Sequence, residues 1–288
     1  MSSSHLPAAD WISRALSLPG QSRWAEIAGN RVHYLEWGAN DRPGVLLVPG
    51  FRAHARWWDF VAPLLADQFH VVAIDLGGMG DSGYRPVYSH ALYAEEIAGV
   101  IEHAQLRSAT VVGHSFGGIV SIGAAWRFPH AIARAVIIDS RVSFPDSDVR
   151  REGPERHAKR RYPDASSALQ RFRLVPDQGG VVAPIWDHVA AHSIKQEDGA
   201  WVWKFDDACA APGLLLPELT DAEMLQEIAL PVDYICGEFS SVVPPALAQR
   251  IGRCLRNGRG PIVIPDAHHH VLLDQPLALT AVLRALLA

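Results

Sequence analysis

Cysteine is scarce in this sequence. The 288 residues contain only Cys209, Cys236 and Cys254, an odd number with no C-x-x-C pair among them. This scarcity argues against a disulfide framework and against a zinc site built from thiolates. It suits a reducing compartment, so we expect a cytoplasmic location.

The sequence also lacks an excess of positive charge. Lys and Arg number 26 against 31 Asp and Glu, which gives a formal net charge of −5. We therefore expect no nucleic acid partner and no binding to an anionic membrane surface. Residues 108–126 carry no charged side chain, but the glycine-rich turn GHSFGG inside them would be costly in lipid. That stretch is better interpreted as a buried strand, a turn and a buried helix.

What the sequence does contain is an alternation of short apolar runs with amphipathic segments. Such alternation predicts a parallel sheet covered by helices on both faces. Ahead of it, RWAEIAGNRVHYLEWG predicts a hairpin that turns at Gly29 and Asn30. The predicted strands are 44–50, 70–75, 109–114, 133–139, 231–237 and 260–265, and the predicted helices are 56–68, 90–106, 116–128, 244–255 and 275–287.

The alternation stops in the middle of the chain. Residues 141–228 are rich in Arg, Pro and Trp and show no strand pattern. We therefore predict an α/β core made of 1–140 and 229–288, interrupted by an all-helical cap at 141–228.

The motif GHSFGG lies between a predicted strand and a predicted helix. It matches G-x-S-x-G at Gly113, Ser115 and Gly117. Side chains at the two glycine positions would collide where the backbone reverses, and the turn would expose the Ser115 hydroxyl above the sheet. The motif predicts a nucleophilic serine, and a glycine-rich packing turn without chemistry is the alternative.

Several ordered motifs together resemble the α/β-hydrolase family over nearly the whole chain. The resemblance implies a mostly parallel eight-stranded sheet flanked by helices, an inserted helical cap and a serine hydrolase or esterase-like activity without a cofactor. It also implies that the backbone N–H groups of Phe51 and Phe116 form the oxyanion hole, although Pro49 replaces the histidine that usually precedes the glycine. The motifs are VPGF (48–51), DLGGMGDSG (75–83), GHSFGG (113–118), CGEFSSVVP (236–244) and PDAHHHVLLDQP (265–276).

The segment GMGDSG also spells G-x-G-x-x-G, the pattern of a dinucleotide-binding turn. That fingerprint belongs after the first strand of a βαβ unit, whereas this segment follows the fourth predicted strand. A loop bordering the active site is the better interpretation.

Three consecutive histidines, His268 to His270, compete for the role of general base. In the family, a proline follows the catalytic histidine by seven positions, and counting back from Pro276 gives His269. By the same resemblance, His268 stands where glycine is usual. We expect His270 to point elsewhere and the cluster to bind no metal, because consecutive residues do not easily converge on one ion.

The acid that orients His269 departs from the common pattern of the family. The usual position, three residues after Gly237, holds Ser240. Some dehalogenases and the zearalenone-lactone hydrolases place the acid at the end of the sixth strand, and there the chain has Asp139. Glu238 and Asp266 are rival candidates.

These features predict a carboxylic ester hydrolase. We expect an ester or lactone with an apolar or aromatic part to be cleaved through an acyl-enzyme on Ser115, with His269 and Asp139 completing a triad. Trp186, Trp201 and Trp203 are candidates to line the substrate pocket. The alternatives are a carbon–carbon bond hydrolase of the meta-cleavage type and a non-catalytic binding member of the fold. The oligomeric state stays open.

Overall fold

A computed structural model describes residues 8–146, 160–210 and 219–288 of the chain. Eight strands form one sheet in the order β1-β2-β4-β3-β5-β6-β9-β10, and β7 and β8 form a second sheet. The expected mostly parallel eight-stranded sheet is confirmed, since only the pairs that involve β2 are antiparallel. The strands are β1 (Gln21–Ile27), β2 (Asn30–Trp37), β3 (Pro43–Val48), β4 (His70–Ile74), β5 (Arg107–His114), β6 (Arg134–Ile138), β7 (Ile194–Glu197), β8 (Ala200–Trp203), β9 (Val232–Gly237) and β10 (Ile262–Ile264).

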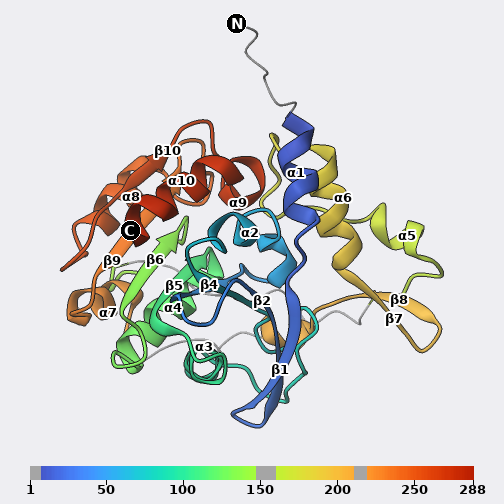
Figure 1. Ribbon diagram of the computed structural model, residues 1–288, viewed down its shortest axis with the longest axis horizontal. Coiled ribbons are helices and arrows are strands. Elements are labelled where there is room, and N and C mark those ends of the chain that lie inside the picture. The colour runs from blue at the N-terminus through green and yellow to red at the C-terminus, as the bar shows by residue number, and fades with distance from the viewer. Residues whose placement is uncertain (1–7, 147–159, 211–218) are drawn as a thin grey trace, which may run out of the picture.

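Helices cover both faces of the large sheet (Figure 1). Alternation along the strands divides the core in two: Val111 packs with one hydrophobic cluster and Val112 with the other. One cluster includes side chains of α3, α4, α7 and α8, and the other includes those of α1, η1, α2, α9 and α10. The helices are α1 (Ala8–Leu16), η1 (Ala55–Trp58), α2 (Ala62–Leu65), α3 (His90–His103), α4 (Phe116–Arg127), α5 (Ala165–Leu169), α6 (Ala183–His192), η2 (Asp207–Ala210), α7 (Asp221–Glu227), α8 (Pro245–Gly252), α9 (Val271–Asp274) and α10 (Pro276–Leu287).

Two local expectations are wrong by small margins. The first hairpin turns at Ala28 and Gly29, because Ile27 already pairs with Asn30. The helix predicted over 56–68 is instead a 3₁₀ turn, η1, followed by the short helix α2. Pro63 has no N–H to continue a helix and is tolerated only in a first turn, so a new helix begins beside it.

The expectation of an all-helical segment at 141–228 is wrong. β7 and β8 form an antiparallel hairpin, with Asp198 and Gly199 at its turn in left-handed conformations (φ +48° and +76°). Asp-Gly is a strong hairpin signal, but each flanking strand is too short to display a clear period of two. The hairpin lies with α5 and α6 at one side of the molecule, on the right in Figure 1. The domain boundaries stay a prediction, since residues 147–159 and 211–218 lie outside the described residues.

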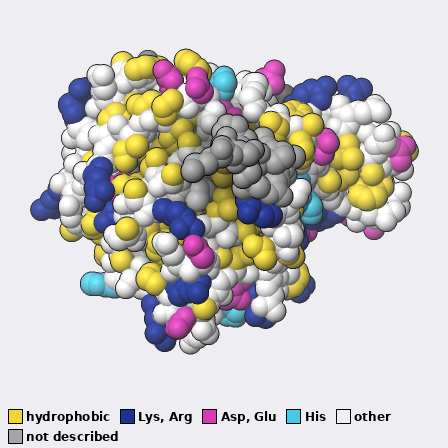
Figure 2. Space-filling model, turned by 45° about the horizontal axis from the view of Figure 1, so that its top comes forward, with side chains coloured by type: hydrophobic (Ala, Val, Ile, Leu, Met, Phe, Trp, Pro, Cys, Tyr) yellow, Lys and Arg dark blue, Asp and Glu magenta, His cyan; other side chains and the backbone are white. Residues whose placement is uncertain are grey.

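The charge on the surface and the length of the helices relate to the expected absence of nucleic acid and membrane partners, which stays a prediction. In the face shown in Figure 2, basic and acidic side chains are interspersed among apolar ones. Within the described ranges, no helix is both long and apolar enough to cross a membrane.

Candidate active site

Ser115 occupies a strained turn between β5 and α4. Its backbone has φ +54° and ψ −121°, a region that non-glycine residues adopt at a cost of about 1–3 kcal/mol. A Cβ at Gly113 would collide with the Gly117 carbonyl oxygen, and a Cβ at Gly117 would collide with the carbonyl oxygens of Val48 and Pro49. The Ser115 N–H donates to the Ile138 carbonyl at 2.8 Å, which fixes the turn on β6.

His269 meets Ser115 from the loop between β10 and α9. Its Nε2 lies 3.0 Å from the Ser115 Oγ, and its Nδ1 lies 3.0 Å from Asp139 Oδ1. His268 instead contacts Asp274, whose Oδ2 accepts from its backbone N–H and lies 3.1 Å from its Nδ1. The structure thus brings His269, and not His268, to the serine.

Asp139 is fully buried at the end of β6, with its backbone in the left-handed region at φ +46°. Its Oδ2 accepts a hydrogen bond from the Gly237 N–H at 2.8 Å. Its Oδ1 accepts a second one from the Ser240 hydroxyl at 2.6 Å, besides the contact with His269. Ser240 occupies the position where the family usually has the acid. Here its hydroxyl instead donates a hydrogen bond to the Asp139 carboxylate and fixes its position.

The two rival acids lie away from His269. Glu238 and Asp266 are both exposed, and the Asp266 N–H donates to Glu238 Oε2 at 3.0 Å. The two residues are therefore joined to each other at the surface. Among the described residues, the carboxylate with a hydrogen bond to His269 is that of Asp139.

The two expected oxyanion donors flank the serine. Phe116 is the first residue of α4, so its N–H has no partner inside the helix. Phe51 follows Gly50, where an added Cβ would lie only 3.4 Å from the Ser115 Cβ. The partly exposed rings of Phe51 and Phe116 pack edge to face at 5.7 Å and present an apolar surface beside Ser115.

The loop that carries Phe51 is braced without the usual histidine at Pro49. The Ala55 N–H donates to Asp75 Oδ1 at 2.6 Å. His54 Nε2 lies 2.9 Å from the Ser193 Oγ, and the Arg52 guanidinium donates to Asp207 Oδ1 at 2.9 Å. These contacts attach the loop to β4 on one side and to residues 193–207 on the other.

The glycine-rich loop after β4 is covered by protein backbone. The Gly80 N–H donates to the Lys204 carbonyl at 2.8 Å, and the Asp206 N–H donates to the Gly78 carbonyl at 2.7 Å. Met79 pairs with Phe205 as an isolated bridge between these bonds. The loop is therefore a docking point for residues 204–206, and the amide of Gly80 is already used.

The three candidate pocket tryptophans pack inside the segment of 160–205. The Trp186 ring lies 5.1 Å from Phe172, and the Trp203 ring lies 6.0 Å from Tyr162. Trp201 exchanges two backbone hydrogen bonds with Tyr162, each of 2.9 Å. These contacts favour a structural role, and the pocket-lining role stays a prediction.

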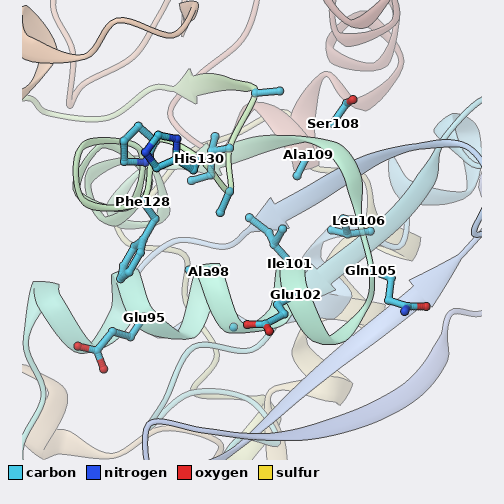
Figure 3. A pocket seen from close by; sticks show the side chains of 15 residues that line it. Glu95, Ala98, Ile101, Glu102, Gln105, Leu106, Ser108, Ala109, Phe128 and His130 are labelled. Carbon is cyan, nitrogen blue, oxygen red and sulfur yellow. The ribbon is translucent and has the colours of Figure 1, made fainter.

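A groove elsewhere on the surface is not part of this site. It is lined by α3 and by residues 105–109 and 128–133, with Phe128, Leu106 and Glu102 among its side chains (Figure 3). The groove lies where β5 and β6 begin, whereas Ser115 and Asp139 follow the ends of the same strands. The groove and the serine therefore lie at opposite edges of the sheet.

Two further histidines surround His269, and the sequence interpretation missed their arrangement. The ring centroids of His114 and His270 lie 5.0 Å and 4.8 Å from that of His269. The expectation that His270 points elsewhere is therefore wrong. Burial, with the neighbouring charge of His269, lowers the pKa of His270 to about 3 and that of His114 well below its usual value.

Comparison with known proteins agrees with this architecture. The model described as the alpha/beta hydrolase family matches residues 45–282. Since this range is most of the chain, the protein belongs to the α/β hydrolase family. The resemblance seen in the sequence motifs is thereby confirmed.

Individual relatives extend the likeness to almost the full length. The chain is similar to esterase Rv0045c of Mycobacterium tuberculosis (strain ATCC 25618 / H37Rv), with 26% identity over 270 residues that cover 91% of this chain and 88% of the relative. A structure of that esterase, from work on its inhibition by transition metals, shares the fold with a TM-score of 0.75 at 22% identity over 99% of both chains. The structure of E-2-(acetamidomethylene)succinate hydrolase has a TM-score of 0.77 at 22% identity and covers 93% of this chain and 99% of that one.

Proposed function

We propose that this protein is a serine hydrolase that cleaves a carboxylic ester or lactone through an acyl-enzyme on Ser115. The observation that supports the proposal most is the continuous array of Ser115, His269 and Asp139, joined by two contacts of 3.0 Å. The similarity to an esterase over 91% of the chain supports the same activity.

In the first half-reaction, the Ser115 Oγ attacks the substrate carbonyl carbon while His269 Nε2 takes the hydroxyl proton. The carbonyl oxygen becomes an oxyanion, to which the N–H groups of Phe51 and Phe116 donate. Removing one such donor typically costs about 10²–10³ in rate. When the tetrahedral intermediate collapses, the bond to the alcohol oxygen breaks and His269 returns the proton to that oxygen.

In the second half-reaction, water replaces the alcohol. His269 removes a proton from the water while the water oxygen attacks the acyl carbon. When this second tetrahedral intermediate collapses, the bond to Ser115 breaks and His269 returns the proton to the Ser115 Oγ. Asp139 keeps Nδ1 of His269 protonated and stabilises the imidazolium that forms twice in each cycle. Its two other hydrogen bonds, from Gly237 and Ser240, hold the carboxylate in place for this role.

The surroundings of the serine favour a substrate with an apolar or aromatic part. The rings of Phe51 and Phe116 pack edge to face at 5.7 Å beside Ser115, and Tyr93 packs edge to face against Phe116 at 5.5 Å. An apolar acyl or alcohol group would bury its surface against these rings, which stabilises binding. The three free cysteines are all buried, in keeping with the proposed cytoplasmic location.

Labelling with a fluorophosphonate tests the proposal directly. We expect the probe to attach to Ser115 of the purified protein and not to the Ser115→Ala variant, with the site read by peptide mass spectrometry. Turnover is then measured on p-nitrophenyl esters of increasing acyl length and on macrocyclic lactones. Absence of labelling at Ser115 would contradict the hydrolase mechanism. Labelling together with turnover only of a meta-cleavage substrate would instead indicate carbon–carbon bond hydrolysis.

A further inference from the structure

Three buried imidazoles converge beside Ser115. One ring nitrogen each of His114, His269 and His270 lies within 4.8 Å of the others, and the three residues are 1%, 3% and 4% exposed. Three of their ring nitrogens have no hydrogen-bond partner among the described residues. These are Nδ1 and Nε2 of His270 and Nδ1 of His114. The Pro176 carbonyl faces His270 outside hydrogen-bond geometry. A buried polar atom without a partner costs about 1–3 kcal/mol, so three of them in one place require an explanation.

The hydrogen bonds determine which nitrogens carry free lone pairs. His114 Nε2 lies 2.9 Å from the His269 carbonyl oxygen and must donate to it. The lone pair of neutral His114 is therefore at Nδ1. For His269, donation from Nδ1 to Asp139 leaves the lone pair at Nε2, the nitrogen that faces Ser115. His270 offers a lone pair at either nitrogen.

We propose that His114, His269 and His270 form a binding site for one divalent transition metal ion, such as Zn²⁺ or Cu²⁺, which switches the hydrolase off. The inhibitory part rests on the proposed function, whereas binding of the ion does not. Neutral imidazole is a preferred ligand of both ions, and three histidines are a sufficient set with one further position left for water or the serine oxygen.

The dimensions of the cluster fit after a small adjustment. Zinc–nitrogen bonds of about 2.0–2.1 Å place two ligands of a tetrahedral site roughly 3.4 Å apart. The nitrogens, within 4.8 Å of one another, therefore need to close by on the order of 1 Å, which ring rotation can supply. Gly50 places no side chain against His114 Nδ1: a Cβ there would lie 3.3 Å from that nitrogen and 3.4 Å from the Ser115 Cβ, closer than an ordinary contact.

Binding of the ion is incompatible with catalysis. The lone pair of His269 Nε2 accepts the Ser115 proton in the proposed mechanism, and a metal bond would use the same pair. Ser115 would then lose its base while the fold, the acid and the oxyanion donors remain in place. The expected inhibition is therefore reversible by a chelator.

A second group of potential ligands shows the contrast. His33, Asp75 and Asp81 also place ligand atoms within 4.8 Å of one another. Both ring nitrogens of His33 have partners, however, at 2.7 Å on Asp75 and 2.6 Å on Ser22, and Asp81 pairs with Lys204. That group is satisfied as it stands, whereas the cluster beside Ser115 is not.

Zinc inhibition of two histidine variants tests the site. His270→Leu removes one ligand and fills similar space against Trp57, whose ring lies 5.4 Å from that of His270. His268→Ala is the matched control, because it removes the adjacent histidine, whose side chain is 34% exposed and lies outside the cluster. We expect basal turnover within about threefold in both, and a half-inhibitory Zn²⁺ concentration at least about 10-fold higher in His270→Leu alone, as loss of one ligand implies.

A direct measurement separates the site from the proposed function. Calorimetric titration of Zn²⁺ into the Ser115→Ala protein should show one ion per chain, and the added His270→Leu change should abolish it. Cu²⁺ bound to the unmodified chain should show coupling to two or more imidazole nitrogens by electron paramagnetic resonance, which decides the matter if His270→Leu fails to fold. Equal zinc sensitivity of His270→Leu and the unmodified protein would overturn the proposal. Loss of sensitivity in His268→Ala would also overturn it, by moving the ion to the pair of His268 and Asp274.

Discussion

The molecule contains two arrays of serine, histidine and aspartate with the same connectivity. In one, Ser115, His269 and Asp139 are joined at 3.0 Å and 3.0 Å. In the other, the Ser22 Oγ lies 2.6 Å from His33 Nε2, and His33 Nδ1 lies 2.7 Å from Asp75 Oδ2. Judged by hydrogen bonds alone, the second array is the tighter of the two.

The backbone around each serine is what distinguishes the arrays. Ser22 is an exposed residue of the antiparallel strand β1, paired in regular register with Leu35. Ser115 has a positive φ at the N-cap of α4, directly before Phe116, whose N–H has no partner inside the helix. We therefore expect that a triad of hydrogen bonds is not sufficient for acyl transfer, and that the strained turn and the proposed oxyanion donors supply what the second array lacks.

The largest expected effect comes from removing the two serines in turn. Ser115→Ala should lower kcat by several orders of magnitude, because the nucleophile itself is lost. Ser22→Ala should leave kcat within about twofold, as surface changes usually do. Turnover on one p-nitrophenyl ester, with circular dichroism to check folding, measures both. Comparable losses in the two variants would mean that the second array takes part in catalysis.

Substitution of Asp139 should likewise lower kcat far more than substitution of Asp75. Asp139→Asn should lower kcat by up to about 10⁴, since His269 would lose the carboxylate that orients and stabilises it. Asp75→Asn should lower kcat by no more than about 10-fold but reduce stability, because Asp75 accepts from the Ala55 N–H that braces the oxyanion loop. Turnover and thermal unfolding of both variants are measured beside Glu238→Gln. Collapse of turnover in Glu238→Gln with normal turnover in Asp139→Asn would transfer the role of the acid to Glu238.

Ser240 gives a smaller effect and a sharper test of the acid. Its hydroxyl accepts from the Val242 and Val243 N–H groups at 3.2 Å and 3.0 Å, so its proton is directed to Asp139. Losing a hydrogen bond to a charged group, in Ser240→Ala, should lower kcat by about 10-fold to 100-fold. The exposed neighbour Ser241, changed to Ala, is the control.

Placing the acid at the position that is usual in the family, residue 240, extends that test. Adding Ser240→Asp to the Asp139→Asn variant places a carboxylate where most of the family has one, and kcat should recover at least about 10-fold over Asp139→Asn alone. If Ser240→Ala is as active as the unmodified protein, the hydroxyl has no positioning role.

The smallest expected effect is on the pH dependence of the free energy of unfolding, and it concerns His54. This residue lies in the loop between Phe51 and the Ala55 N–H that donates to Asp75. Burial lowers its pKa from 6.5 to about 4, against the opposing charges of Asp75 and Asp59. The unfolded chain therefore binds the proton first as pH falls. The stability that the neutral, buried His54 contributes is fully present above pH 6.5 and is lost progressively as the pH falls to about 4. The loss in the free energy of unfolding is on the order of 3 kcal/mol for this group.

Urea unfolding between pH 7.5 and 4.5 measures that slope. His54→Gln keeps a donor near Ser193 but cannot titrate, so its stability should fall less steeply with acid than that of the unmodified protein. Parallel curves would show that other buried groups, such as His114 and His270, cause the acid sensitivity.

Much of the core was predictable because its signals are local. Short continuous apolar runs and segments with a helical period identified the strands and helices around Ser115. The hairpin of β7 and β8 was not predicted, because a strand of four residues is too short to display a period of two, and the Asp198-Gly199 turn was overlooked.

The sequence by itself determined the α/β class, the strained turn at Ser115 and the short set of residues that could serve it. Each of these depends on neighbours along the chain, where glycines and side-chain periods act directly on the backbone. Only the tertiary structure decided which histidine and which carboxylate meet the serine, since those side chains are 154 and 130 positions from their partners. The convergence of His114 with His270, and the satisfied array at Ser22, likewise arise from packing of distant segments, which no local pattern encodes.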